Sequence, residues 1–217
     1  AAYRRCRPGS IRSGTSGFDR PARDIYTRRA CRDRRPVART APEHGIPVLS
    51  IFLQIHPENP QKRLLQQVVD RLRAGAVIIY PTDSAYALGC HIGDKAALDR
   101  IRAIRRLDEK HNFTLMCRDL SELSTYAIVD NVSYRLLRTH TPGPYTFILK
   151  ATAEVPRRLM HPRRKTIGMR VPDNAIALGL LELLHEPLMS VTLTPPGEEL
   201  PLPEPQDMRE RLGHAVH

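Results

Sequence analysis

The sequence contains no tryptophan, few aromatic residues and no long apolar run. Aromatic side chains make up 5% of the 217 residues. No stretch approaches the roughly 20 consecutive apolar residues that a membrane-spanning helix needs, so we expect no membrane partner. The first residues also lack the apolar core of a secretory signal. Because 41% of the residues are apolar, the chain can still bury a substantial core.

Cysteine is scarce too. The four cysteines are Cys6, Cys31, Cys90 and Cys117, and they show neither a C-x-x-C pair nor a nearby histidine pattern. This spacing argues against a zinc site, so we expect no bound metal. We interpret the cysteines as reduced thiols, buried inside a cytoplasmic protein.

Several catalytic signatures are missing from the sequence. There is no G-x-S-x-G elbow, no phosphate-binding Walker loop and no glycine-rich dinucleotide fingerprint. The nine histidines form no pair at helical spacing with a carboxylate in register, so a metalloprotease-like site is unsupported. We therefore expect no tightly bound cofactor, and the residues alone support little more than a domain with an anion site.

Positive charge is plentiful and unevenly placed. The net charge is +11, and the first 50 residues hold twelve Arg and no Lys against four acids, which leaves only +3 for the remainder. We predict a disordered Arg-rich segment over residues 1–47 and a globular domain over residues 48–217. The first segment has three competing explanations: a basic nucleic-acid arm, a targeting peptide, or translation upstream of the true start. Its four acids argue against the targeting peptide.

The globular part shows helical and strand periodicities in alternation. Helices are predicted at residues 60–74, 95–107, 131–139, 175–184 and 205–212. Strands are predicted at residues 50–55, 77–80, 113–117, 145–151, 167–171 and 188–193. This alternation indicates an α/β or α+β domain with a mixed sheet. The sequence stops where a further carboxyl-terminal strand would be expected.

Residues 80–90 (YPTDSAYALGC) carry the most informative chemistry in the chain. Thr82, Asp83, Ser84 and Tyr86 follow a short buried strand. In α/β sheets, small polar ligands bind at the carboxyl ends of strands. The alternative is a turn, with Gly89 as a turn residue, in which Asp83 and Ser84 simply cap backbone N–H groups. On composition alone, the turn is favoured.

Two basic stretches suggest contact with phosphates. Residues 105–112 and 156–170 are rich in Arg, Lys and His. The second stretch is the better candidate for an RNA-binding surface. Its candidate contacts are Arg157, Arg158, Arg163, Arg164 and Lys165. No aromatic residues interleave there, so we expect shape-based contact with a duplex rather than base stacking. A solvated charged face is the alternative.

Five motifs occur in the order found in the YrdC-like family. They are PTDSAYALGC at residues 81–90, HNFTLM at 111–116, TPGPYTFIL at 141–149, TIGMRVP at 166–172 and PLMSVT at 187–192. The resemblance is strongest to the YciO branch, through HPENPQ at residues 56–61 and NFTLMCRDLSELST at 112–125. It spans roughly residue 52 to the end, and a start near residues 48–50 fits upstream translation of residues 1–47.

The resemblance implies a fold, partners and a site. The fold is a twisted mixed sheet with helices on both sides and a concave basic cavity. The family includes threonylcarbamoyl-AMP synthases, which use threonine, bicarbonate and ATP in tRNA modification, and proteins that bind double-stranded RNA. ATP with Mg is then a candidate substrate, and AMP a candidate ligand. By motif, Thr82, Tyr86 and Arg105 bind the amino-acid substrate, and the nucleotide contacts are Thr146, Arg170, Ser190 and Thr192.

Two positions depart from the synthases. Their K-x-R motif has Leu107 in place of its arginine, and their S-x-N motif becomes Thr192-Leu193-Thr194. Leucine supplies neither the charge nor the donors of a guanidinium. Loss of such a contact to developing charge costs about 2.7–4 kcal/mol of transition-state stabilisation. We therefore expect a cytoplasmic protein that binds nucleotide and double-stranded RNA or tRNA; a weak synthase is the alternative, and the catalytic residues stay unassigned.

Overall fold

The computed structural model describes residues 50–108, 111–198, 200–202 and 204–217. The predicted disordered segment, residues 1–47, lies outside the described residues. Within the described part, no helix combines the length and the apolar character needed to cross a membrane.

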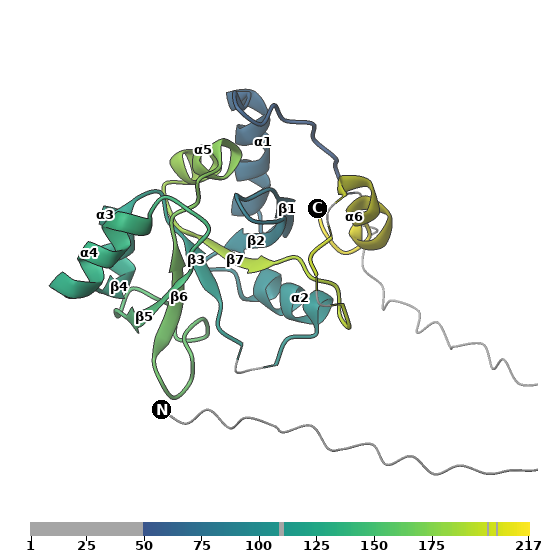
Figure 1. Ribbon diagram of the computed structural model, residues 1–217. Helices are drawn as coiled ribbons and strands as arrows, with labels where there is room; N and C mark the ends of the chain where they lie inside the picture. Colours follow the sequence, from purple (N-terminus) through teal and green to yellow (C-terminus); the bar gives the residue numbers. More distant parts are fainter. Residues whose placement is uncertain (1–49, 109–110, 199, 203) are drawn as a thin grey trace, which may run out of the picture. The chain divides into compact units, whose positions relative to one another are not determined.

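The described residues form six helices and seven strands (Figure 1). The helices are α1 (Lys62–Arg73), α2 (Lys95–Arg105), α3 (Leu120–Tyr126), α4 (Asn131–His140), α5 (Ala175–Leu184) and α6 (Pro205–Leu212). The strands are β1 (Ile78–Tyr80), β2 (Ala87–His91), β3 (Thr114–Met116), β4 (Ala127–Ile128), β5 (Phe147–Ala151), β6 (Thr166–Arg170) and β7 (Leu188–Thr192).

All seven described strands join one sheet, in the order β1-β2-β7-β3-β6-β5-β4. Strands β3 and β6 run parallel, and every other neighbouring pair is antiparallel. The predicted mixed α/β sheet is therefore confirmed. The register aligns Gly89, Ser190, Thr114 and Gly168 in one row across four strands.

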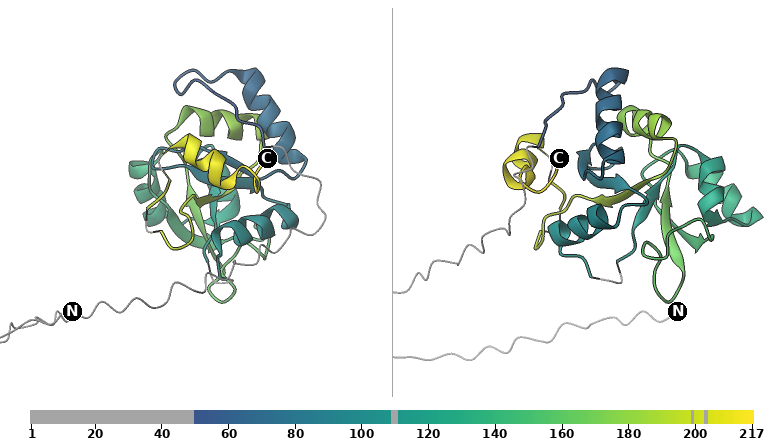
Figure 2. Two further views of the ribbon diagram at one scale, coloured as in Figure 1. Left: turned by 90° about the vertical axis from the view of Figure 1, so that its right-hand side faces the viewer. Right: turned by 180° about the vertical axis from the view of Figure 1, so that it is seen from behind.

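Helices cover both faces of the sheet. On one face, α1 and α5 pack side by side over Ile78, Ala87 and Leu188 at the β1–β2 side (Figure 2). On the opposite face, apolar residues of α2 pack into a larger core with Leu88 and Met189. Since successive strand residues point to opposite faces, Ser190 and Arg170 lie on the face of α1 and α5.

Local sequence signals placed most elements correctly. The predicted helices at residues 175–184 and 205–212 match α5 and α6. The helix after Asp94 is confirmed together with its cap, because the Asp94 carboxylate accepts from Ala97 N at 2.9 Å. The helix α3 was missed, although Asp119 and Glu122 form a short capping signature at its start.

Two predictions near β1 were wrong. The strand predicted at residues 50–55 pairs with no described strand, and Phe52 instead lies under the guanidinium of Arg209 from α6. Gly89 is not a turn residue, because it sits in the middle of β2 between Ile78 and Ser190. Glycine within a strand marks close approach of another group, and here the ring of Tyr80 crosses it.

Candidate functional site

A small polar pocket opens on the sheet face beyond α1 and α5. We call it the Arg170 pocket, and its enclosed volume is about 30 Å³. It is lined by Thr82, Ala85, Ala87, Thr114, Met116, Thr146, Arg170, Ser190, Val191 and Thr192. The structure thus brings together five of the seven residues that the sequence assigned to substrate and nucleotide, although they are spread over residues 82–192 of the chain.

Strand register explains why these side chains meet. Ser190 of β7 faces Thr114 of β3, and Thr114 faces Gly168 of β6, all on one face of the sheet. Gly168 leaves room for its neighbours, because an added Cβ would lie 2.8 Å from Thr114 Oγ1 and 3.0 Å from Phe113 O. Thr146 closes the same corner, 3.1 Å from that Cβ position. The pocket floor therefore needs glycine at residue 168.

The segment after β1 is a tight turn organised by Thr82. Its hydroxyl donates to Ala85 O at 2.5 Å and accepts from Ala85 N at 3.2 Å and Ser84 N at 3.3 Å. The turn exists, but Thr82 caps it, whereas the turn interpretation assigned the caps to Asp83 and Ser84, whose side chains contact Arg170 instead. The turn has a second consequence, because it directs the two residues that follow Thr82 toward β6.

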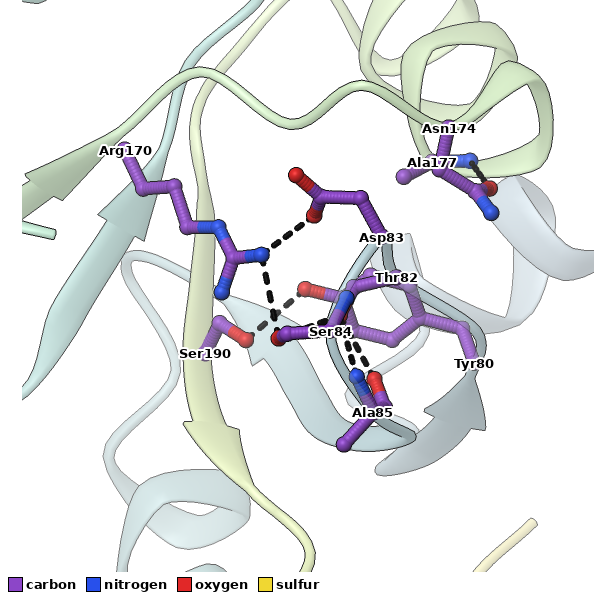
Figure 3. A network of polar contacts seen from close by, with 9 residues as sticks. All are labelled: Tyr80, Thr82, Asp83, Ser84, Ala85, Arg170, Asn174, Ala177 and Ser190. Carbon is purple, nitrogen blue, oxygen red and sulfur yellow. Dashed lines mark hydrogen bonds and ion pairs between the residues drawn. The ribbon is translucent and has the colours of Figure 1, made fainter. Parts of the chain in front are cut away.

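Arg170 is the one cation among the described residues that line the pocket. Its side chain is 9% exposed, and it forms an ion pair with Asp83, whose side chain is also 9% exposed. The same nitrogen, Nη2, donates to Ser84 Oγ at 3.1 Å (Figure 3). Neither Arg170 Nε nor Asp83 Oδ2 has a hydrogen-bond partner among the described residues. The charge pair is therefore buried and only partly satisfied.

Tyr80 and Ser190 form a second buried polar contact beside the first. The Tyr80 hydroxyl donates to Ser190 Oγ at 2.8 Å across the position of Gly89. Burial raises the pKa of the Tyr80 phenol well above its ordinary value, which outweighs the lowering by Ser190 and Arg170. Because tyrosine is the donor, the Ser190 hydroxyl proton stays available for a ligand in the pocket.

The other two predicted substrate residues lie outside the Arg170 pocket. Tyr86 packs against the larger core and lines a separate cavity of about 310 Å³, walled by residues 50–55, α1, β1, α5, α6 and the residues after α6. Arg105 is the last residue of α2, and burial lowers the pKa of its guanidinium. The sequence predicted all seven residues in one site, and their ligand contacts stay predictions.

The predicted RNA-binding residues lie on the exposed segment between β5 and β6, which we call the basic loop (residues 152–165). Arg157, Arg158, Arg163, Arg164 and Lys165 are all exposed. Arg158 donates to Gly93 O, while its own carbonyl accepts from Arg102 Nη2 at 3.3 Å. The His161 ring accepts from Arg163 N and Arg164 N at 3.3 and 3.2 Å. The Arg158 contacts hold the loop against Arg102 of α2 and Gly93 before it, and the His161 contacts close a turn within the loop.

The basic loop and the Arg170 pocket lie at opposite ends of β6. The loop enters the strand at Thr166, and Arg170 ends it. A five-residue strand spans about 13 Å between its first and last residues. None of the five loop cations lines the pocket. The cations predicted for RNA and the residues predicted for nucleotide therefore form separate surfaces among the described residues.

Sequence reasoning left some pocket residues unassigned. Thr114 lay in a predicted strand, and Asp83 was noted but read as part of a turn. Their signal was alternation: Thr114 and Gly168 occupy strand positions whose neighbours, Leu115 and Ile167, are fully buried in the opposite core. Across the described residues, no group of three His, Cys, Asp or Glu side chains is arranged to hold a metal.

The two departures from the synthase motifs have distinct surroundings. Leu107 is partly buried and packs against the larger hydrophobic core, where an arginine would need a counter-charge. Thr194 follows the pocket residue Thr192, and its backbone N–H donates back to Thr192 O at 3.0 Å. Neither residue lines the Arg170 pocket.

The chain is similar to proteins of the family that the motifs indicated. The Sua5_yciO_yrdC family profile, described as telomere recombination, matches residues 70–217. YciO of Escherichia coli K12, described as uncharacterized, is 60% identical over 168 residues, which cover 77% of this chain and 82% of that protein. Its crystal structure superposes with a TM-score of 0.75 over 77% of this chain and 81% of that chain.

More distant relatives include named enzymes. A threonylcarbamoyl-AMP synthase of Vibrio vulnificus YJ016 is 30% identical over 137 residues, which cover 62% of this chain and 73% of that protein. The fold is also that of P. abyssi Sua5, whose crystal structure in complex with L-threonine superposes with a TM-score of 0.68 at 22% identity, over 74% of this chain and 47% of that chain.

Proposed function

Because this chain belongs to the Sua5/YciO/YrdC family, we propose that it binds a nucleotide in the Arg170 pocket and double-stranded RNA or tRNA through the basic loop. The observation that carries the nucleotide half is the convergence of Thr146, Arg170, Ser190 and Thr192 on one pocket. We place this activity in the cytoplasm, where the buried free thiols of Cys90 and Cys117 stay reduced.

The lining of the pocket suits a phosphate or adenylate group. An arginine provides charge and donors for an oxyanion, and five hydroxyl side chains line the pocket with it. The pocket volume of about 30 Å³ has room for about two water-sized groups. Only a small anionic group of the ligand would enter it, while the rest of the nucleotide would lie along the exposed residues Thr146 and Thr192.

The basic loop suits a sugar-phosphate backbone. Its five cations are exposed, and the loop conformation is fixed by contacts with α2, so binding would order little additional chain. Contacts of this type read shape and charge rather than sequence. No tightly bound cofactor is required for either half of the proposal, since ATP with Mg would enter as substrate.

Calorimetry with ATP and AMP tests the nucleotide half. We expect saturable one-site binding of at least one of them to the full chain, with loss of most affinity in Arg170→Ala. Since that variant leaves Asp83 buried without its partner, Thr146→Val serves as a second variant at an exposed wall position. Absence of ATP and AMP binding by the folded wild-type protein would refute nucleotide binding.

Fluorescence anisotropy with labelled duplex RNA and tRNA tests the other half. We expect binding at low salt whose affinity falls steeply as the salt concentration rises, because neutralised phosphates release counterions. Single-stranded RNA of the same length is the control, and it should bind more weakly. If neither duplex RNA nor tRNA binds at low salt, the RNA half is wrong.

A weak threonylcarbamoyl-AMP synthase is the second candidate function. It is supported by the 30% identity with the Vibrio vulnificus synthase, and opposed by Leu107 and Thr194 at the two altered motif positions. The assay incubates the protein with ATP and Mg, threonine and bicarbonate and follows pyrophosphate release that requires all three substrates. A rate equal to the protein-free blank would exclude this function.

A further inference from the structure

We infer that Asp83 competes with the oxyanion of the ligand for Arg170, and so sets both the affinity and the anion selectivity of the pocket. The inference rests on the proposed binding of a nucleotide in the Arg170 pocket. When the nucleotide binds, its phosphate replaces the Asp83 carboxylate on the Arg170 guanidinium, and the turn at residues 81–85 moves with Asp83. No covalent step is involved, only an exchange of ion-pair partners.

Burial of Arg170 makes its guanidinium dependent on an anionic partner. The Arg170 side chain is 9% exposed, and an arginine that is always charged needs an anionic partner at such a depth. Asp83 is that partner among the described residues. Because two anionic groups at one guanidinium nitrogen repel each other, a ligand anion gains access to Nη2 where Asp83 gives up its place.

The ion pair between Arg170 and Asp83 leaves hydrogen-bonding groups unused. Arginine and carboxylate pair best through two parallel hydrogen bonds. Here a single nitrogen, Nη2, serves both Asp83 Oδ1 and Ser84 Oγ, while Nε and Asp83 Oδ2 have no partners among the described residues. Unsatisfied buried groups oppose the pairing, so a phosphate with three oxygens has more to offer the guanidinium than Asp83 does.

The position of Asp83 in the chain allows it to move. It lies on the turn between β1 and β2, outside the strand pairing, and the residues around it, Thr82 and Ala85, line the pocket (Figure 3). The contacts inside the turn are those of Thr82, which move with it, and Asp83 and Ser84 tie the turn to β6 through Arg170 Nη2. Movement of Asp83 would therefore release charge on Arg170 and enlarge the 30 Å³ pocket in one event.

The test compares wild type with Asp83→Asn, which keeps the shape and an acceptor oxygen but removes the charge. Calorimetry with AMP, inorganic phosphate and L-threonine distinguishes a phosphate from a carboxylate as the favoured anion. If Asp83 holds Arg170 in about nine of ten molecules, Asp83→Asn should tighten AMP binding about tenfold. Asp70→Asn, on the exposed face of α1, controls for the change in net charge and should leave affinity unchanged.

A second measurement covers the case in which Asp83→Asn fails to fold. In the wild-type protein, the ¹⁵N–¹H signal of Arg170 Nε should shift when AMP saturates the site, with assignment by Arg170→Lys. The inference is overturned, and nucleotide binding stands, if folded Asp83→Asn binds AMP with weaker or unchanged affinity, or if the Arg170 Nε signal does not shift when AMP binds. If neither protein binds AMP or ATP, the proposed nucleotide binding is overturned as well.

Discussion

At the scale of single residues, Tyr80 decides the architecture of the pocket wall. Its ring crosses β2 above Gly89, because a Cβ at residue 89 would lie 2.8 Å from Tyr80 Cε1. The hydroxyl then reaches Ser190 on the next strand. Tyr80 and Ser190 are each 3% exposed, so the hydrogen bond between their hydroxyls is buried. The pair thus fixes the orientation of Ser190 toward the pocket.

We predict non-additive losses of stability when this pair is broken. Tyr80→Phe and Ser190→Ala should each lower the free energy of unfolding by about 1–3 kcal/mol, because each strands a buried hydroxyl. The double variant should lose less than the sum, since no orphaned group remains. Urea unfolding of the four proteins measures the coupling. Simple additivity would show that the hydrogen bond contributes nothing to the fold.

Gly168 is the second residue on which the pocket depends. Gly168→Ala should lower the unfolding free energy by about 1–3 kcal/mol, because its Cβ would meet Thr114 and a backbone carbonyl. It should also abolish AMP binding in calorimetry. Gly93→Ala is the control, since the nearest atom to its Cβ would be His91 Nδ1 at 3.3 Å, which is farther than every contact at Gly168. Equal stability of both variants would contradict the close packing described for the pocket floor.

At the scale of secondary structure, helix caps decide where the elements beside the pocket begin. Asn174 Oδ1 accepts from Ile176 N and Ala177 N, both at 3.0 Å, and starts α5 directly after β6. The helix then packs beside α1 with most of its apolar residues buried. Its start is therefore fixed by a local contact, although its stability comes from packing.

We predict that Asn174→Ala lowers the free energy of unfolding by about 0.5–2 kcal/mol, because two amide groups lose their shared acceptor. Glu204→Ala is the control, since Glu204 stands at the same position of α6 without a side-chain cap, and it should change stability little. Thermal and urea unfolding compare the two variants. A loss as large in Glu204→Ala would indicate a general effect of alanine at these positions.

Neighbouring residues in the sequence predict helix starts well, but they do not predict strand pairing. Asp94 and Asp130 cap α2 and α4 through contacts three residues away, so the sequence alone locates these helix starts. Gly89 looked like a turn residue, because its role depends on Tyr80, nine positions earlier, and on strand pairing. The segment at residues 50–55 has a strand-like pattern, yet no described strand accepts it.

At the scale of the whole molecule, the structure separates two surfaces that the sequence predicted as one cavity. The basic loop precedes β6, and Arg170 ends that strand. The two surfaces share no lining residue. Nucleotide and RNA would thus contact the protein independently unless β6 itself moves.

We predict a double dissociation between the two surfaces. The triple variant Arg163→Gln, Arg164→Gln, Lys165→Gln should weaken duplex RNA binding. It should also reduce the slope of log K against the logarithm of the salt concentration by about 2.7, at about 0.9 per lost phosphate contact. Its affinity for AMP should stay that of wild type. Thr146→Val should weaken AMP binding about three- to tenfold through the lost hydroxyl, with RNA binding unchanged. Parallel losses of both ligands in either variant would indicate one shared site.

The amino-acid sequence alone predicts the alternation of helices and strands, the capped start of α2, the motifs of the family and the excess of positive charge. These features depend on residues close together in the chain. The meeting of Thr82, Arg170 and Ser190 in one pocket, the pairing of Asp83 with Arg170 and the separate place of the basic loop are visible in the folded sheet alone. They depend on strand order and register, which pair segments about 100 residues apart and are set by packing of the whole sheet.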